Sequence, residues 1–295
     1  MAACTYDITA INTEGVGGIM STADKIFKEM CKDILTNGVW DTGYDVRPRW
    51  EDGTPAHTIK KFGVINRYDL QESFPILTLR KTNFKAAVDE LLWIWQKKSN
   101  NVKDLNSHIW DAWADETGSI GKAYGYQLGI KHKYKEGEFD QVDRVLYDLK
   151  HNPTSRRILT NIYNFQDLHE MHLYPCAYGM TFNVSGNKLN AILNQRSQDV
   201  LAANNWNVVQ YSILVHMMAQ VSGLVAGELV HVIADAHIYD RHVPIIEELI
   251  EMEEHDPPIL EIDETIDDFY KFTVDSFNII NYKYNPFKVK VPIAV

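Results

Sequence analysis

The tetrapeptide Leu173-Tyr-Pro-Cys176 opens the segment around which this chain is organised, and Asp235-Ala-His-Ile-Tyr-Asp-Arg-His242 closes it. Between them lie Gln195-Arg-Ser-Gln-Asp199 and Asn205-Trp-Asn207. The segment gathers a thiol, an arginine, amides, carboxylates, histidines and a tyrosine among apolar runs that we expect to be rigid. Reactive groups arranged along a rigid scaffold predict an active site.

Two strands are predicted directly after Cys176, over residues 178–184 and 189–194, joined by the favourable turn sequence Ser185-Gly186-Asn187. Antiparallel pairing of these strands would bring Arg196 close to Cys176. A neighbouring guanidinium would lower the pKa of the thiol and favour the nucleophilic thiolate. Spacing alone, however, favours a buried and inert cysteine.

The remainder of the segment predicts a helix and a strand. Residues 208–225 are so apolar that this helix, ending near Gly223, should lie in the core. Residues 228–234 are predicted to form a strand that presents Asp235, His237 and Tyr239 at its end, where loops commonly build sites.

Outward from this segment, the pattern predicts further elements. Helices are expected over 22–37, with Thr22 as the cap, over 83–97 and over 140–151, and strands over 59–69, 74–79 and 158–163. Glu90 interrupts an apolar helix, so it either faces outward or is held there for chemistry, because an unpaired buried carboxylate is costly.

Two other features allow both a structural and a functional interpretation. Trp110 and Trp113 lie one helical turn apart. They either pack in the core or form an aromatic wall on which a flat ring could stack. The irregular stretch 39–58 carries Arg47 and Arg49, which fits a binding loop or a solvated turn.

Composition limits the possible classes of protein. The chain has 295 residues, 45% of them apolar, with 29 Lys and Arg against 40 Asp and Glu and a formal net charge of −11. Such an acidic protein is not expected to bind nucleic acid or an anionic membrane. No run reaches the ~18 apolar residues of a membrane span and no signal peptide is evident, so we expect a cytoplasmic protein.

Three scattered cysteines indicate a reducing compartment and no zinc site, because a structural zinc site needs closely spaced ligand pairs. They are Cys4, Cys31 and Cys176. The length permits one large domain or two ordinary ones.

Read together, these motifs resemble the thymidylate synthase family, in its divergent bacterial and phage branch. The matching motifs are Tyr174-Pro-Cys176, Gln195-Arg-Ser-x-Asp199, Trp206-Asn207, His216-Met-Met-Ala-Gln220, Asp235-x-His-x-Tyr239, Glu90-Leu-Leu-Trp93, Ile109-Trp-x-x-Trp-Ala-Asp115, Ser155-Arg-Arg157 and Pro292-Ile-Ala-Val295. Each motif is weak alone, but in this order and spacing, from about Asp24 onward, they are highly specific together.

The resemblance implies a single α+β domain over residues 1–295, with 1–21 as a loosely ordered extension. A large twisted mixed β-sheet would be covered by helices on one face and would form a homodimer interface with the other. The implied reaction is reductive methylation of dUMP to dTMP. 5,10-Methylenetetrahydrofolate would be the co-substrate that gives the one-carbon unit and a hydride and leaves as dihydrofolate, and no metal is expected.

The resemblance also implies roles for individual residues. Cys176 would attack C6 of the uracil, Glu90 and Tyr124 would transfer protons through ordered water, and Asn207 and Asp199 would complete the catalytic set. The dUMP-binding set would be Arg47, Arg156, Arg157, Arg196, Ser197, Asn207, His237 and Tyr239, with Arg156 and Arg157 supplied by the other subunit. The folate-binding set would be Ile109, Trp110, Trp113, Asp199, Trp206 and Ala294, with Ala294-Val295 closing over the complex.

The sequence also departs from the family pattern. Tyr174 and Ala177 replace a more usual proline and histidine, and Asp240-Arg241 replaces Ser-Asn. The phosphate loop lacks the usual Arg-Thr-Gly-x-Gly run, so Arg49 stands as an alternative to Arg47.

The sequence leaves two alternative functions open. One is a dUMP or dCMP hydroxymethylase of the same family, although a cytosine substrate calls for aspartate where this chain has Asn207. The other is a non-catalytic, RNA-binding or structural module on the same fold. The retained reactive groups and the acidic charge argue against the second.

Overall fold

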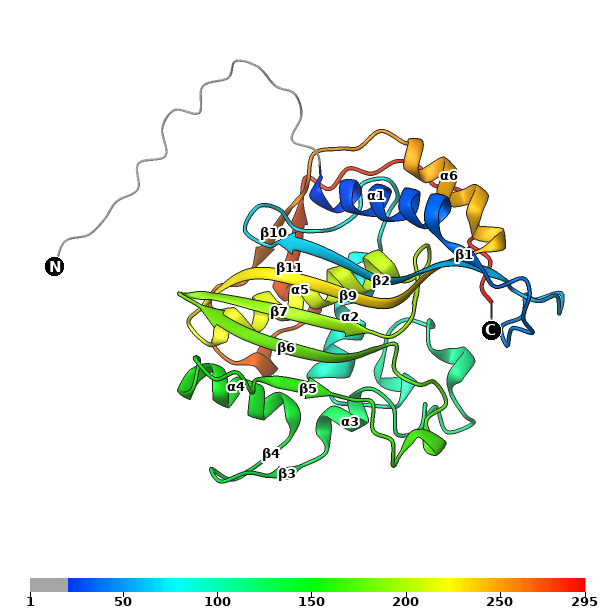
Figure 1. Cartoon of the computed structure of the whole chain (residues 1–295). Coiled ribbons are helices and arrows are strands. Elements are labelled where there is room, and N and C mark those ends of the chain that lie inside the picture. Colours follow the sequence, from blue (N-terminus) through cyan, green and yellow to red (C-terminus); the bar gives the residue numbers. More distant parts are fainter. Residues whose placement is uncertain (1–20, 295) are drawn as a thin grey trace, which may run out of the picture.

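A mixed seven-stranded β-sheet forms the centre of the computed structural model, which describes residues 21–294 (Figure 1). Five strands follow β1 in the order β2, β9, β7, β6 and β5, and β8 pairs with β9 beside them. The expectations for the N-terminal extension up to residue 20 and for Val295 lie outside the described residues.

The sheet strands are β1 (Val39–Trp40), β2 (Thr58–Asp69), β5 (Leu159–Asn161), β6 (Ala177–Ser185), β7 (Lys188–Gln195), β8 (Gln198–Asp199) and β9 (Val225–Tyr239). Two small ribbons pair β3 (His132–Lys133) with β4 (Glu138–Phe139) and β10 (Ile259–Ile262) with β11 (Phe277–Ile280). The α-helices are α1 (Thr22–Asn37), α2 (Phe84–Trp95), α3 (Gly125–Gly129), α4 (Gln141–His151), α5 (Asn204–Val221) and α6 (Val243–Glu251). Short 3₁₀ helices cover Val102–Asp104, Asp111–Trp113, Leu168–Glu170, Asp240–His242, Phe269–Lys271 and Val274–Ser276.

Helix α5 is buried along most of its length because it lies between the sheet and α2. It follows β7 and the short β8 and leads into β9. Strand β9 is parallel to β7, whereas the β2–β9, β6–β7 and β5–β6 pairs are antiparallel. Its contacts include both β9 and α2. This double burial explains why its sequence is apolar on almost every side.

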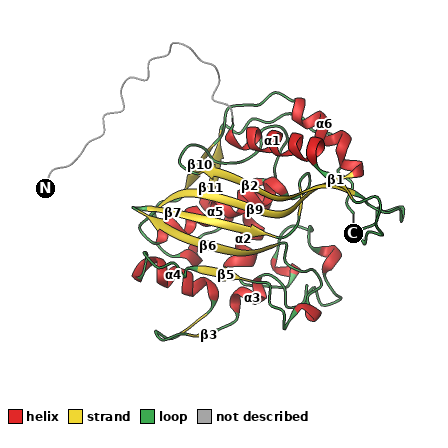
Figure 2. Ribbon diagram, viewed as in Figure 1, coloured by secondary structure: helices red, strands yellow, loops and turns green. Residues whose placement is uncertain are grey.

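The helices cover one face of the sheet (Figure 2). One apolar cluster joins α2 and α5 to β6, β7 and β9, and a second joins α1 and α6 to β2 and the far half of β9. Strand register places Leu159, Ile192 and Ile65 together on the opposite face, where they are 52%, 38% and 58% exposed. The large α+β fold predicted from the sequence is confirmed.

Three predicted elements need correction. Residues 74–79 form no strand, because side chains satisfy their backbone: Leu77 N donates to Asn205 Oδ1 (3.0 Å) and Thr78 N to Asp24 Oδ1 (2.9 Å). Strand β9 continues through Tyr239, which pairs with Thr58. Helix α5 begins at Asn204, earlier than predicted, and ends at Val221, just before Gly223 turns the chain with φ +69°.

Helix α1 matches its predicted range, but its cap differs. Ser21, one residue before the expected Thr22, is the N-cap, with its hydroxyl oxygen accepting from Asp24 N (3.5 Å).

Candidate active site

The hairpin of β6 and β7 brings Cys176 and Arg196 together, as the sequence predicts. Ala177 pairs with Gln195, and Arg196 N donates to Cys176 O (2.9 Å). The guanidinium of Arg196 donates from Nε to Pro175 O (2.9 Å) and from Nη2 to Tyr174 O (2.8 Å). Nη2 also lies 3.8 Å from Cys176 Sγ. Arg196 therefore encloses the turn that presents the thiol.

The pKa of the Cys176 thiol lies above its ordinary value. Burial raises it, and the charges of Arg196 and Arg47 together with a hydrogen bond from Tyr124 lower it by less. The predicted lowering effect of the guanidinium is present, but desolvation outweighs it, so the pKa of the thiol is raised overall.

Tyr124 joins the thiol turn to an aromatic cluster. Its Oη accepts from Cys176 N at 3.2 Å, and its ring packs against Trp110 with centroids 4.8 Å apart. Its backbone has φ +46°, a strained conformation for a tyrosine. The next residue, Gly125, lacks a side chain, and the site requires this because a Cβ there would lie 2.4 Å from Ser99 O. The chain thus holds Tyr124 in a strained backbone conformation with its hydroxyl against the thiol turn.

Glu90 faces inward and is clamped by two indoles. Trp110 Nε1 donates to its Oε1 at 2.9 Å, and Trp206 Nε1 donates to its Oε2 at 2.5 Å. Burial raises the pKa of Glu90 to about 7, while hydrogen bonds from Trp110, Trp206 and Gln210 hold it lower than burial alone would. The sequence allowed Glu90 either to face outward or to be held in the interior, and the structure shows it buried.

Asn207 is held in one orientation by neighbouring amides. Its Oδ1 accepts from Gln195 Nε2 (3.2 Å), and its Nδ2 donates to Gln210 Oε1 (3.3 Å). Gln195 Nε2 also donates to Ser197 O (3.1 Å), and its Oε1 accepts from His231 Nε2 (2.8 Å). Burial lowers the pKa of His231 to about 3, so its ring is neutral.

Asp199 lies beside a histidine that also holds the C-terminal segment. Its Oδ1 is 3.4 Å from His242 Nδ1, and His242 Nε2 donates to Pro292 O (2.7 Å). Burial would raise the pKa of Asp199, but His242 and backbone N–H groups lower it overall. Ala294 follows two residues after Pro292 and is half-buried. This bridge could not be predicted, because no local sequence pattern marks a fully buried histidine such as His242.

His237 and Tyr239 lie near the end of β9, with ring centroids 5.2 Å apart. His237 Nδ1 is hydrogen-bonded to Asp235 Oδ1 at 2.8 Å. Tyr239 also packs edge-on against Trp50, at 5.6 Å. A paired strand therefore positions these two side chains, where the sequence predicted a loop.

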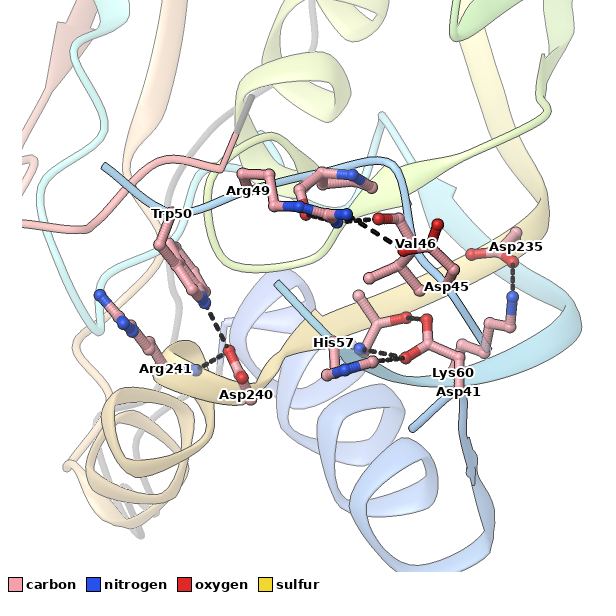
Figure 3. Close-up of polar contacts among 12 residues, drawn as sticks. Asp41, Asp45, Val46, Arg49, Trp50, His57, Lys60, Asp235, Asp240 and Arg241 are labelled. Carbon is pink, nitrogen blue, oxygen red and sulfur yellow. Dashed lines mark hydrogen bonds and ion pairs between the residues drawn. The ribbon is translucent and has the colours of Figure 1, made fainter. Parts of the chain in front are cut away.

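The loop that precedes β2 is anchored and is not a free turn (Figure 3). Asp41 accepts from Thr58 N (2.9 Å) and Thr58 Oγ1 (2.7 Å), and Trp50 Nε1 donates to Asp240 Oδ1 (3.0 Å). Arg49 is bound within the loop, to Asp45 Oδ1 (3.0 Å) and to the carbonyls of Val46 and Pro48.

Arg47 differs from Arg49 in its surroundings. It is exposed, and its side chain makes no hydrogen bond or ion pair within residues 21–294. Its charge is close enough to lower the pKa of Cys176, and it opposes the burial that raises the pKa of Tyr239 to about 12. Of the two arginines, Arg47 is the one available to a ligand beside the thiol.

Arg156 and Arg157 are not brought to Cys176 in this chain. Both are exposed just before β5, where Leu159 pairs with Thr181. Cys176 precedes the opposite end of β6. At about 3.3 Å per residue, the strand separates these arginines from the thiol by roughly 20 Å.

The apolar residues expected around a folate differ in accessibility. Trp110 is only 7% exposed, whereas Ile109 is 43% exposed and Trp113 and Trp206 are half-buried. The rings of Trp110 and Trp113 are 5.7 Å apart. Trp113 and Trp206 therefore offer more surface to a ligand than Trp110 does.

The described residues contain neither a membrane-spanning helix nor a cluster of metal-ligating side chains. Within residues 21–294, no helix combines the length and the apolar character needed to span a membrane. In the same range, no three His, Cys, Asp or Glu side chains are grouped so that they could hold a metal ion.

Comparison with known proteins places the chain in one family. The sequence model of thymidylate synthase matches residues 25–295. The chain is 46% identical over 281 residues to thymidylate synthases of Bacillus subtilis subsp. natto and Bacillus phage phi3T, covering 94% of this chain and 100% of each relative. A solved structure, thermostable thymidylate synthase A from Bacillus subtilis, superimposes with a TM-score of 0.89 at 44% identity, covering 92% of this chain and 99% of that one. The chain therefore belongs to the thymidylate synthase family.

Proposed function

We propose that this chain catalyses the reductive methylation of dUMP to dTMP, with 5,10-methylenetetrahydrofolate as co-substrate. The observation that carries the proposal is the thiol of Cys176, held beside the Arg196 guanidinium and joined through Tyr124 to the buried Glu90 cluster. Neither alternative function is favoured, since the similar proteins found are named thymidylate synthases.

The thiolate of Cys176 would form a bond to C6 of the uracil, and the electron pair of the C5–C6 double bond would move toward C5 and O4. C5 would then attack the one-carbon unit. After the C5 proton and the folate amine leave, hydride delivery to the resulting exocyclic methylene would restore the C5–C6 double bond and expel the Cys176 thiolate. Because burial raises the pKa of the thiol, Arg196 and Arg47 are needed to favour the thiolate. The folate supplies the one-carbon unit and the hydride when bound.

Glu90 and Tyr124 would handle protons. A carboxyl group with a pKa of about 7 is present in both protonation states at neutral pH, which suits proton exchange with a bound pyrimidine through water. Burial keeps the pKa of Tyr124 well above its ordinary value, so Tyr124 stays protonated and can donate a hydrogen bond.

The dUMP phosphate would be bound by Arg47, Arg196 and Ser197. We choose Arg47 over Arg49, because the Arg49 guanidinium is already occupied by Asp45 and loop carbonyls. A guanidinium without a protein partner can give two parallel hydrogen bonds to a phosphate. His237 and Tyr239 would contact the deoxyribose hydroxyl.

The folate site fits a flat aromatic ring with a hydrogen-bonding edge. Trp113, Trp206, Ile109 and the edge of Trp110 would pack the ring, and Asp199 would accept a hydrogen bond from it. The lowered pKa of Asp199 keeps the carboxylate ionised, as an acceptor must be. Ala294 lies on the segment fixed by His242, where it can cover the bound ligand.

Members of this family are homodimers that act on small molecules. The open face of the sheet would be the interface, since Phe62 (88% exposed), Ile65, Leu159 and Ile192 leave an apolar surface that a monomer would expose to water. In such a dimer, Arg156 and Arg157 would bind the phosphate in the partner's site.

Mixing two inactive variants tests this exchange of arginines. We expect Cys176→Ala and the double variant Arg156→Ala, Arg157→Ala to be nearly inactive separately. In a hybrid dimer, one site combines an intact Cys176 with intact partner arginines, so random subunit exchange should restore about one quarter of wild-type activity. No recovery after verified exchange would show that the pair does not serve the neighbouring site.

Asn207→Asp should shift nucleotide preference toward dCMP. The amide offers an acceptor and a donor, which match N3–H and O4 of uracil, whereas a protonated or ionised carboxyl group matches cytosine better. We expect the ratio of dUMP to dCMP affinity to fall at least about tenfold, measured by titration calorimetry. An unchanged ratio would remove Asn207 from base recognition.

Product analysis tests the proposed function itself. The protein is incubated with dUMP and 5,10-methylenetetrahydrofolate, the absorbance change of dihydrofolate formation is followed, and the nucleotide is identified by mass. Dihydrofolate with dTMP is expected. Tetrahydrofolate with a hydroxymethylated nucleotide would instead indicate the hydroxymethylase, and no reaction would leave only the fold.

A further inference from the structure

Two indole donors from different parts of the chain hold the Glu90 carboxylate, in addition to a hydrogen bond from Gln210. Trp110 precedes a short 3₁₀ helix, and Trp206 lies in the first turn of α5. An indole N–H can only donate, so both carboxylate oxygens are used as acceptors. The shorter contact is that of Trp206, at 2.5 Å.

We propose that Trp206 is a positioning residue for Glu90: its indole N–H fixes one carboxylate oxygen and favours the ionised form that accepts a proton. This inference rests on the proposed role of Glu90 and gives Trp206 a part in the reaction that differs from packing a folate ring. In this role, Trp206 would affect the reaction only by orienting Glu90 and stabilising its ionised form.

The surroundings of Glu90 make this donor important. Asp89, its neighbour on α2, disfavours its charge, and Tyr124 and Tyr211 face it as neutral hydroxyls whose pKa values burial raises. No Lys, Arg or His forms an ion pair with Glu90 anywhere in residues 21–294. Neutral donors alone therefore oppose the desolvation of the carboxylate, and a hydrogen bond to a charged acceptor is about twice as strong as a neutral one.

The start of α5 is rigid enough to hold the indole in place. Asn205, directly before Trp206, accepts from Leu77 N (3.0 Å) and Thr82 Oγ1 (2.7 Å) and donates to Pro75 O (3.0 Å). Asn207, directly after it, is fixed by amides as described above. One helical turn therefore holds both the donor to Glu90 and the amide expected to read the pyrimidine.

The test is the pH dependence of kcat/KM in the Trp206→Phe variant. Phenylalanine keeps a ring but removes the N–H. We expect the acid limb of the profile to move upward by about one to two pH units, with activity at neutral pH falling about tenfold or more and recovering at higher pH. A role in packing alone would change the height of the profile and leave the position of its acid limb unchanged.

Two controls isolate the N–H contact. In the Glu90→Gln background, Trp206→Phe should produce no shift, since the titrating group is gone. Trp50→Phe removes another indole donor to a carboxylate, Asp240 Oδ1 at 3.0 Å, away from Glu90. It should leave the acid limb at its wild-type pH.

The outcomes separate this inference from the proposed function. If Glu90→Gln abolishes the acid limb but folded Trp206→Phe does not move it, the inference is overturned and the role of Glu90 stands. If Glu90→Gln retains the wild-type rate and profile, the proposed role of Glu90 fails first. Should Trp206→Phe not fold, Trp206→Leu provides the same measurement on a smaller side chain.

Discussion

Cys176→Ala should abolish turnover and leave dUMP binding largely intact. Within residues 21–294 no second thiol lies at this turn, and the neighbouring Tyr124 hydroxyl stays protonated because burial raises its pKa, so the covalent step has no substitute nucleophile. We expect a loss of roughly 10⁴-fold or more in kcat. Affinity for dUMP should change little, because phosphate and base contacts come from other side chains. Rate assays and calorimetric titration with dUMP measure the two quantities.

Cys31→Ala is the matched control for thiol chemistry. Cys31 is fully buried in α1, and burial raises the pKa of its thiol far above the ordinary range. This variant should retain wild-type kcat and lose only some stability. If Cys176→Ala retained more than about one hundredth of the wild-type turnover rate, Cys176 could not be the nucleophile.

The local sequence pattern was enough to predict that the guanidinium of Arg196 lies beside the thiol of Cys176. Two strands and a glycine turn specify a hairpin, and hairpin register alone places Arg196 against Cys176. The same reasoning could not give the direction of the thiol pKa. That direction depends on how much surrounding chain excludes water, which is a tertiary quantity.

The contacts of Glu90 and Asn207 could not be predicted, because each joins segments that are distant in sequence. Glu90 meets Trp206 across 116 positions, and Gln195 meets His231 across 36. The family resemblance named Glu90, Trp206 and Asn207 but not the bonds among them. Gln195 belongs to a family motif, whereas His231 is one residue of an apolar strand pattern and has no motif of its own.

The strand wrongly predicted at 74–79 shows why an apolar pattern alone is ambiguous. The run Phe74-Pro-Ile-Leu-Thr-Leu79 is fully buried, as a central strand would be. Its backbone instead bonds to Asp24 and Asn205, two side chains at helix starts. An apolar run can be buried in a strand or in an irregular segment, and its pattern does not reveal which groups satisfy its backbone.

Glu90→Gln should reduce kcat by about 10² to 10⁴ and remove the acid limb of the pH profile. The amide cannot take up a proton near neutral pH and cannot accept from both indoles, since its nitrogen is a donor. The pH profile of kcat/KM between about pH 5 and 9 measures this effect. A retained acid limb near pH 7 would assign it to a different group.

The same substitution should change how stability depends on pH. Burial raises the pKa of Glu90 from its ordinary 4.5 to about 7, so between these values the folded protein binds more protons than the unfolded chain. The free energy of unfolding therefore falls as pH rises through this window, by up to about 3 kcal/mol, and the loss persists above pH 7. Glu90→Gln lacks this titration, so denaturant unfolding at about pH 5 and 8 should show a smaller decrease in the variant than in the wild type. Equal decreases would mean that Glu90 ionises without cost in the folded protein, and the buried carboxylate would then not be the group that exchanges protons at neutral pH.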